Sequence, residues 1–179
     1  RRSRDGPTCT IRGGPVGRGA LAKSPGLLKG AVVMNTGLNA PTEPMELSSA
    51  HTLAKTPILG ELMIERLVSI FDRLPDMQGD PESMATEVRA LYGRPVEESG
   101  NAKAPLAMMR MVPDGPDHPS APAMREIERY VGSLDIPVEL VWGMNDPILG
   151  KGLPTMQQNF PDAPVTETDA GHLLPEEVP

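Results

Sequence analysis

The chain has 179 residues and a formal net charge of −7, and 39% of its residues are hydrophobic. This length suffices for one domain with a buried core, while 18 glycines and 21 prolines indicate a globular protein rich in loops. One tryptophan, two tyrosines and two phenylalanines, together with the acidic charge, argue against nucleic acid as a partner, because such binding uses stacking rings and basic side chains.

Cysteine content and hydropathy indicate the compartment. The single cysteine, Cys9, cannot form an internal disulfide or a thiolate metal site, which fits a reducing environment. The apolar runs are far shorter than the ~20 residues needed to cross a bilayer, and the basic start is not followed by the apolar stretch of a signal peptide. We therefore expect a soluble, cytoplasmic protein with no membrane partner.

The first residues differ in charge from the rest of the chain. Residues 1–23 hold six of the 17 basic residues and a single acid, Asp5. Neither helical periodicity nor strand alternation is visible here, so we interpret residues 1–11 as an irregular basic segment. A fragment, or a stretch of altered reading frame, explains this segment at least as well as a functional basic arm.

The first regular elements follow residue 28. A short apolar run closed by Asn, Thr and Gly at residues 28–37 predicts a strand buried on both faces, as in a parallel sheet. After a loop with two prolines, the apolar residues of 57–74 recur near a period of 3.6. This spacing predicts one helix, with Thr56 as its N-cap and Pro57 in its first turn.

The middle of the chain is less regular. A shorter helix is predicted over residues 81–91, capped by Asp80 and ended by Gly93 and Pro95. Residues 93–121 hold many glycines and prolines. They also contain a methionine-rich patch at residues 108–111, which we expect to fill a gap in a core.

The last third alternates between helix and strand. Helices are predicted over residues 122–134 and 152–159, and strands over residues 136–142 and 164–168. Such alternation predicts an α/β fold with a mostly parallel sheet. About a hundred residues separate the first two strands, several times an ordinary crossover. We expect this insert to be a helical subdomain that lies as a lid over the carboxyl ends of the strands, where ligands bind in such sheets.

Two loops at those carboxyl ends carry candidate catalytic residues. Asp146 follows the strand at 136–142, and His172 follows the strand at 164–168. A carboxylate beside an imidazole fixes its tautomer and stabilises its protonated form, while the second ring nitrogen takes a proton. Either residue alone reads as an ordinary loop residue, but together they indicate an acid–base pair. We interpret His51 and His118, within the insert, as facing solvent.

These residues resemble the haloalkane dehalogenases of the α/β-hydrolase superfamily. Residues 140–147, with the sequence Leu-Val-Trp-Gly-Met-Asn-Asp-Pro, are similar to the family's acid loop, and residues 169–172, Asp-Ala-Gly-His, to its histidine loop. Residues 33–37 resemble the strand before the family's helical cap, and residues 104–113 a cap segment. The resemblance implies the C-terminal portion of an α/β-hydrolase fold, with core parts at residues 12–40 and 134–179 and the cap at residues 41–133.

The resemblance also implies a reaction and exposes a departure. In the family, an aspartate attacks the carbon that bears the halogen, and water activated by the histidine hydrolyses the resulting ester. The family's Asp-Trp-Gly-Gly-Pro is matched here by Ile-Arg-Gly-Gly-Pro at residues 11–15. Ile11 therefore occupies the nucleophile's position and Arg12 that of the halide-binding tryptophan. We expect a truncated chain that is inactive as written.

Two functions remain open at this point. The chain either belongs to a haloalkane dehalogenase-like hydrolase acting on a small organohalide or other small apolar substrate, or is a non-catalytic hydrolase-fold module that binds another protein chain. We expect neither a cofactor nor a metal. A phosphate-binding loop at residues 17–22 fits Gly-x-Gly-x-x-Ala on paper. It lacks the strand before it and the acidic residue about twenty positions later, so we set it aside.

Overall fold

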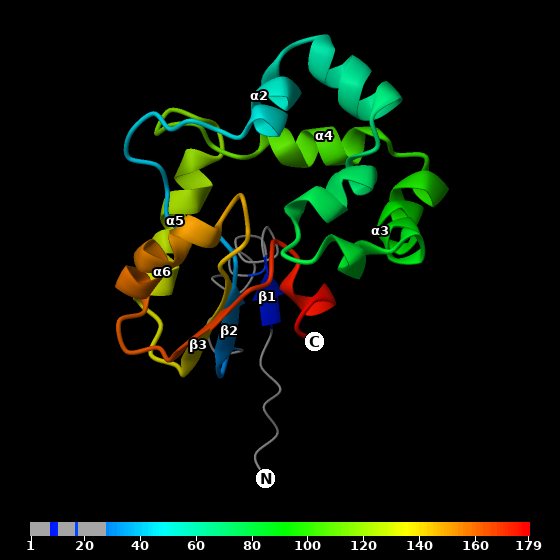
Figure 1. Cartoon of the computed structure of the whole chain (residues 1–179). Helices are drawn as coiled ribbons and strands as arrows, with labels where there is room; N and C mark the ends of the chain where they lie inside the picture. Colours follow the sequence, from blue (N-terminus) through cyan, green and yellow to red (C-terminus); the bar gives the residue numbers. More distant parts are fainter. Residues whose placement is uncertain (1–7, 11–16, 18–27) are drawn as a thin grey trace. The chain divides into compact units, whose positions relative to one another are not determined.

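The computed structural model describes residues 8–10, 17 and 28–179, and these divide into two compact units (Figure 1). The sheet unit comprises the described residues up to Ala40, together with Gln78–Asp80 and Pro122–Pro179. The insert unit comprises Pro41–Met77 and Pro81–Ala121. No helix among the described residues is long and apolar enough to cross a membrane.

The sheet unit is built on four parallel strands in chain order. They are β1 (Thr8–Thr10), β2 (Ala31–Met34), β3 (Val138–Gly143) and β4 (Val165–Thr168). Because all four run in one direction, their carboxyl ends lie at the same edge of the sheet, and the loops after β2, β3 and β4 start there. The α/β class with a parallel sheet, predicted from the alternation of elements, is confirmed.

Strand β1 differs from our interpretation of residues 1–11 as irregular. It pairs with β2 in the register Thr8 to Val32 and Thr10 to Met34. Two threonines favour extended backbone, and the edge of β2 supplies the hydrogen-bonding partner. A run of three residues is too short to show an alternating pattern, so sequence periodicity could not reveal this strand.

One face of the sheet packs against two helices. These are α5 (Ala121–Gly132) and α6 (Leu153–Asn159), which lie beside β2 and β3 in Figure 1. Their apolar side chains form one core with the buried strand residues Val33, Leu140 and Trp142. The members from the two helices are Ile127, Val131, Leu153 and Met156. Each fully buried side chain of this size stabilises the fold by roughly 1.5–3 kcal/mol.

Both helices and strands β2, β3 and β4 lie where the apolar patterns predicted them. Helix α5 extends from Ala121, and all of it after that first residue belongs to the sheet unit. Our predicted cap at residues 41–133 includes this helix. Since Ile127 and Val131 pack into the core of the sheet, the helix completes that core instead.

The insert unit consists of short helices. They are α2 (Ser49–Lys55), the π-helix η2 (Glu61–Leu67), the 3-10 helices η3 (Ile70–Met77) and η4 (Pro81–Met84), α3 (Thr86–Ser99) and α4 (Lys103–Arg110). The prediction of one helix over residues 57–74 with Thr56 as N-cap is wrong. Thr56 ends α2 instead, and Val68, with extended backbone, separates η2 from η3.

Gly60, the N-cap of η2, is closely packed against the preceding helix. A Cβ on Gly60 would lie 2.6 Å from the carbonyl oxygen of Ala54, so η2 starts in close contact with α2. The residue that caps α2 is Ser48, whose Oγ accepts a hydrogen bond from the His51 backbone N–H at 3.5 Å. Helical periodicity alone reports helical segments and not the breaks between them.

Helix α3 is longer than predicted, since it continues through Gly93 and Pro95 to Ser99. Gly93 is buried against the ring of Phe71, where a Cβ would lie 3.4 Å from Phe71 Cδ2. The left-handed residue that ends the helix is Gly100, with φ of 63°. Of the methionine patch, Met108 and Met111 are exposed, so the expectation that they fill a core is wrong.

Candidate active site

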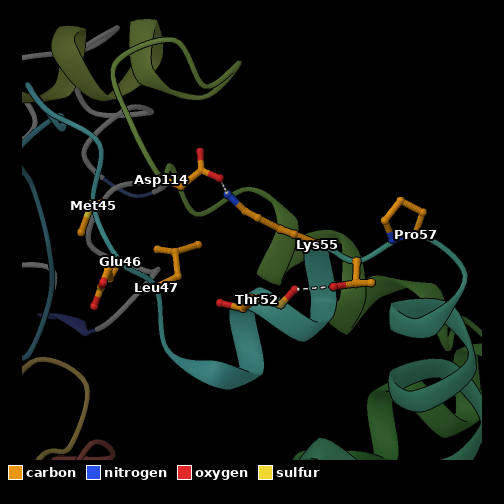
Figure 2. A pocket seen from close by; sticks show the side chains of 8 residues that line it. Met45, Glu46, Leu47, Thr52, Lys55, Pro57 and Asp114 are labelled. Atoms are coloured by element: carbon orange, nitrogen blue, oxygen red, sulfur yellow. Dashed lines mark hydrogen bonds and ion pairs between the residues drawn. The ribbon is translucent and has the colours of Figure 1, made fainter.

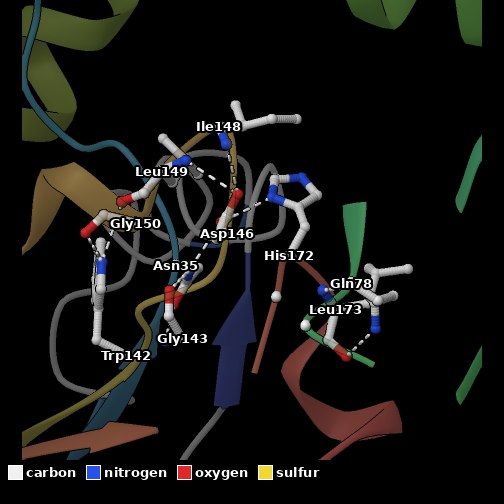
Figure 3. A network of polar contacts seen from close by, with 12 residues as sticks. Asn35, Gln78, Trp142, Gly143, Asp146, Ile148, Leu149, Gly150, His172 and Leu173 are labelled. Atoms are coloured by element: carbon white, nitrogen blue, oxygen red, sulfur yellow. Dashed lines mark hydrogen bonds and ion pairs between the residues drawn. The ribbon is translucent and has the colours of Figure 1, made fainter. Parts of the chain in front are cut away.

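Asp146 and His172 meet at the carboxyl edge of the sheet unit (Figure 3). Asp146 lies in the loop after β3 and His172 in the loop after β4, which are neighbouring strands. The Nδ1 atom of His172 lies 2.9 Å from the Oδ2 atom of Asp146. The Asp146 side chain is fully buried, and that of His172 is 11% exposed. The predicted pairing of carboxylate and imidazole is therefore present in the structure.

The acid loop folds around the Asp146 carboxylate. The backbone N–H groups of Ile148 and Leu149 donate to Oδ1 at 2.7 and 3.0 Å. Trp142, at the end of β3, also holds the loop, because its Nε1 donates to the carbonyl oxygens of Leu149 and Gly150 at 3.0 and 3.1 Å. The buried tryptophan thus serves the core with its rings and the loop with its N–H.

Asn35 links the ends of β2 and β3 and was not identified as a site residue from the sequence. Its Nδ2 donates to Asp146 Oδ2 at 2.7 Å and to the Gly143 carbonyl at 3.0 Å. Its Oδ1 accepts from the Gly143 N–H at 2.8 Å. Asn35 is fully buried and has a positive φ of 23°, a region in which Asn is enriched. The available signal was an asparagine at the carboxyl end of a buried strand.

These contacts set the ionisation of Asp146. Burial acts to raise the pKa of this carboxyl, but the hydrogen bond and charge of His172, and the donors on Asn35 and Leu149, outweigh it. The pKa of Asp146 is therefore lowered from its ordinary value. The site holds Asp146 as a carboxylate, the form that can orient an imidazole and stabilise its protonated state.

The histidine loop rests on the end of β3. A Cβ on Gly143 would lie 2.5 Å from the Ala170 carbonyl oxygen and 2.6 Å from that of Gly171. Asn145 also holds the loop, because its Nδ2 donates to the Asp169 carbonyl at 2.7 Å. The close approach that brings His172 to Asp146 thus requires glycine at position 143.

This geometry supports proton transfer. With Nδ1 bonded to Asp146, His172 has its Nε2 available to take a proton from a water molecule. Ile11 and Arg12, which the resemblance places at the nucleophile and halide positions, lie outside the described residues. Strand β1 ends at Thr10, at the edge where β2, β3 and β4 also end, and Ile11 is the next residue in the sequence. Among the described residues, no cluster of acidic, His or Cys side chains is suited to hold a metal ion.

The two other histidines belong to the insert unit and make local contacts. His118 accepts from the Ser120 N–H at its Nδ1 (3.1 Å), and its Nε2 lies 3.2 Å from the Arg110 carbonyl. His51 Nδ1 lies 2.7 Å from Ser48 Oγ. Both rings are half-buried, so our expectation that they face solvent is wrong, and their contacts indicate a structural role.

The insert unit contains a pocket of its own (Figure 2). It is lined by Met45, Glu46, Leu47, Thr52, Lys55, Thr56, Pro57 and Asp114. The Lys55 ammonium lies 2.7 Å from Asp114 Oδ2, and this hydrogen bond lowers the pKa of Asp114. The two charges neutralise each other, and the ion pair connects α2 to the loop after α4. The charged side chains in the pocket lining thus have a structural role that needs no ligand.

Comparison with curated proteins finds two kinds of enzyme. The chain is 32% identical over 93 residues to haloalkane dehalogenase 1 of Mycobacterium bovis, a match that covers 50% of this chain and 31% of that protein. It is 26% identical over 172 residues to the cis-3-alkyl-4-alkyloxetan-2-one decarboxylase of Shewanella oneidensis, covering 92% of this chain and 53% of that protein. The chain thus spans about a third to a half of these relatives. No family model matches the sequence.

Solved structures share the fold over nearly the whole chain. The haloalkane dehalogenase DbeA from Bradyrhizobium elkani superposes with a TM-score of 0.78 at 19% identity, over 95% of this chain and 61% of that one. DatA from Agrobacterium tumefaciens gives 0.78 at 16% identity, over 95% and 60%. The fold of the described residues is therefore that of the α/β-hydrolases, and in sequence the chain is similar to haloalkane dehalogenases.

Proposed function

We propose that this chain carries the acid and the base of a dehalogenase-like hydrolase, with Asp146 as the acid and His172 as the base. The observation that carries the proposal is the 2.9 Å contact between Asp146 Oδ2 and His172 Nδ1 at the carboxyl edge of a parallel sheet. The same edge carries the ligand site in open α/β sheets. Support for the hydrolase class comes from the curated and structural relatives.

In the proposed chemistry, the pair serves the hydrolytic half of the reaction. A nucleophilic carboxylate displaces halide from carbon and forms an alkyl ester. His172 Nε2 then takes a proton from water, and the oxygen of that water attacks the ester carbonyl carbon. The ester bond breaks, the alcohol leaves with a proton, and the carboxylate is restored. Asp146 stabilises the protonated imidazole between these steps.

The substrate proposed is small and apolar. Two side chains of the acid loop, Met144 and Ile148, are 44% and 39% exposed although both are apolar. They flank Asp146 in the chain and offer an apolar rim on the sheet unit beside the pair. An organohalide, which has a small apolar body and no charge to satisfy, suits such a rim.

We propose further that the chain as written does not perform the first half of this reaction. By the resemblance, Ile11 stands at the nucleophile position, and an isoleucine side chain cannot form an ester. Arg12 stands where the family has the tryptophan that holds the halide. The pairing of Thr10 with Met34 supports this assignment, because β1 ends at the edge where Asn35 follows β2, and Ile11 comes next in the sequence.

Trapping of an alkyl-enzyme ester tests the proposal. The variant carries Ile11→Asp and Arg12→Trp, with His172→Ala to stop hydrolysis, and is incubated with 1-bromobutane. Intact-protein mass spectrometry should show the addition of one butyl group to this triple variant and none to His172→Ala alone. Restoring His172 should remove the adduct and release butanol. An adduct on the original chain, or a folded triple variant that gains no butyl group, would contradict the proposal.

Exposed apolar side chains favour a second candidate, a non-catalytic module that binds another protein chain. Several large apolar residues of the insert unit are exposed, led by Ile58 at 83%, Leu91 at 64% and Leu67 at 63%. Exposed apolar surface of this kind often marks a protein interface. The ester-trapping experiment separates the two candidates, since a binding module has no reason to retain a site that accepts 1-bromobutane.

A further inference from the structure

Two side chains bind the backbone on either side of His172. Glu177 Oε1 accepts a hydrogen bond from the Gly171 N–H at 2.8 Å. Gln78 bonds the residue on the other side, since its Oε1 accepts from the Leu173 N–H at 2.9 Å and its Nε2 donates to the Leu173 carbonyl at 3.3 Å. Figure 3 shows Gln78 beside Leu173. The backbone is therefore held one residue before and one residue after the imidazole.

The same carboxylate also binds the segment that contains Gln78. Glu177 accepts from the Gly79 N–H at 3.1 Å and from the Asp80 N–H at 2.7 Å. Hydrogen bonds from backbone N–H groups to a carboxylate are charge-assisted and stronger than those between neutral groups. Glu177 thus joins residues 78–80 to the histidine loop through three N–H groups.

Close packing adds to these hydrogen bonds. A Cβ on Gly79 would overlap the carbonyl oxygen of Asp169, so the segment fits against the histidine loop only with glycine at this position. Gln78 is 7% exposed, and its amide is used by Leu173. Residues 78–80, Glu177 and the histidine loop form one interlocked contact within the sheet unit.

We propose that Glu177 and Gln78 are positioning residues that hold the His172 imidazole in register with the Asp146 carboxylate. The inference rests on the proposed function, in which His172 is the base. A shift of the backbone at Gly171 or Leu173 moves the Cα of His172, and the 2.9 Å contact of its Nδ1 with Asp146 tolerates little movement.

Residues 78–80 are joined at both ends to the insert unit. The segment 78–80 belongs to the sheet unit, yet the chain enters it from Met77 and leaves it at Pro81, both in the insert unit. The backbone on both sides of the segment therefore continues directly into the insert unit.

The imidazole ¹⁵N chemical shifts of His172 in the full chain test the proposal, together with hydrogen exchange of the Gly171 amide. In the original chain, the neutral ring should carry its proton on Nδ1, because that atom donates to Asp146. A ring protonated on Nε2 would contradict the pairing and the proposed function. That outcome is read from the original chain alone, whereas the positioning role is read from variants.

The decisive variant is Glu177→Gln, and Glu167→Gln is its matched control. The Glu167→Gln substitution removes the same negative charge, but at an exposed position of β4. Glu177→Gln places an amide NH₂ against backbone N–H donors, so Gly171 should exchange at least about tenfold faster, and the ring should populate both tautomers. Equal exchange rates and equal tautomer ratios in the two variants would overturn the proposal.

A second variant covers loss of folding. Gly79→Ala keeps every charge and displaces the segment from Asp169, so it should shift the tautomer ratio in the same direction as Glu177→Gln. If both variants unfold while Glu167→Gln stays folded, the proposal is also overturned. In that case the contact holds the whole sheet unit together rather than orienting one imidazole.

Discussion

Asn35 donates a hydrogen bond to Asp146 across two neighbouring strands, with its Nδ2 2.7 Å from Oδ2 of the carboxylate. The same asparagine side chain bonds both the N–H and the carbonyl of Gly143. A single buried amide therefore bonds both the backbone at the end of β3 and the carboxylate of the proposed acid, Asp146. Its removal should cost more than an ordinary surface substitution.

We expect Asn35→Ala to lower the free energy of unfolding by about 1–3 kcal/mol, because it leaves the Gly143 backbone groups and one carboxylate oxygen without this partner. Urea unfolding followed by circular dichroism measures the change. Asn101→Ala, at an exposed position before α4, is the control and should stay within about 0.5 kcal/mol of the original chain. Equal effects of the two substitutions would show that the Asn35 bridge adds nothing to stability.

The lowered pKa of Asp146 predicts how stability depends on pH. The folded pKa lies below the ordinary value of 3.8, so the unfolded chain binds the proton first as the pH falls. The ionised carboxylate contributes its full share of the unfolding free energy at pH values above the ordinary pKa. This contribution is lost as the pH falls through the folded pKa. The difference in unfolding free energy between the original chain and Asp146→Asn should therefore shrink as the pH falls below about 4. A difference that stays constant down to about pH 2.5 would contradict the shift.

Gly143→Ala should disrupt the site through backbone contact. The added methyl group would meet the carbonyl oxygens of Ala170 and Gly171 at 2.5 and 2.6 Å, so the histidine loop must move. We expect a loss of about 1–3 kcal/mol in unfolding free energy, measured by urea unfolding, and loss of the His172 Nδ1–H tautomer in ¹⁵N spectra.

Gly132→Ala is the matched control for that substitution. Apart from its chain neighbours and the backbone of α5 itself, no described atom lies within 4 Å of the position of its Cβ, at the end of α5. This variant should be neutral or more stable by up to about 1 kcal/mol, because alanine restricts the unfolded chain. If Gly143→Ala were as well tolerated as Gly132→Ala, the close approach of the two loops would not be needed for the fold.

Within the insert unit, the hydrogen bond from Lys55 lowers the pKa of Asp114. We expect the carboxyl ¹³C resonance of Asp114 to titrate below pH 3.8 in the original chain and closer to that value in Lys55→Met. An unchanged Asp114 titration in Lys55→Met would assign the shift to a cause other than this pair.

The sequence by itself determined strands β2, β3 and β4 and the pairing of Asp146 with His172. The apolar runs around Val33, Leu140 and Trp142 are buried in the core as their patterns predicted. Parallel strands share one carboxyl edge, so a polar loop after each of two neighbouring strands brings Asp146 and His172 together. Such features are local in sequence, and one physical rule connects each of them to a place in the fold.

Only the tertiary structure decided what holds that pair. Asn35 lies 111 residues from Asp146, and Gln78 lies 95 residues from Leu173, so no local pattern couples them. The start of η2 after α2 likewise depends on packing, because Gly60 must fit against Ala54 of that earlier helix. Hydrogen-bond partners and helix breaks of this kind follow from which surfaces meet after folding, whereas periodicity reports only which face of each segment is apolar.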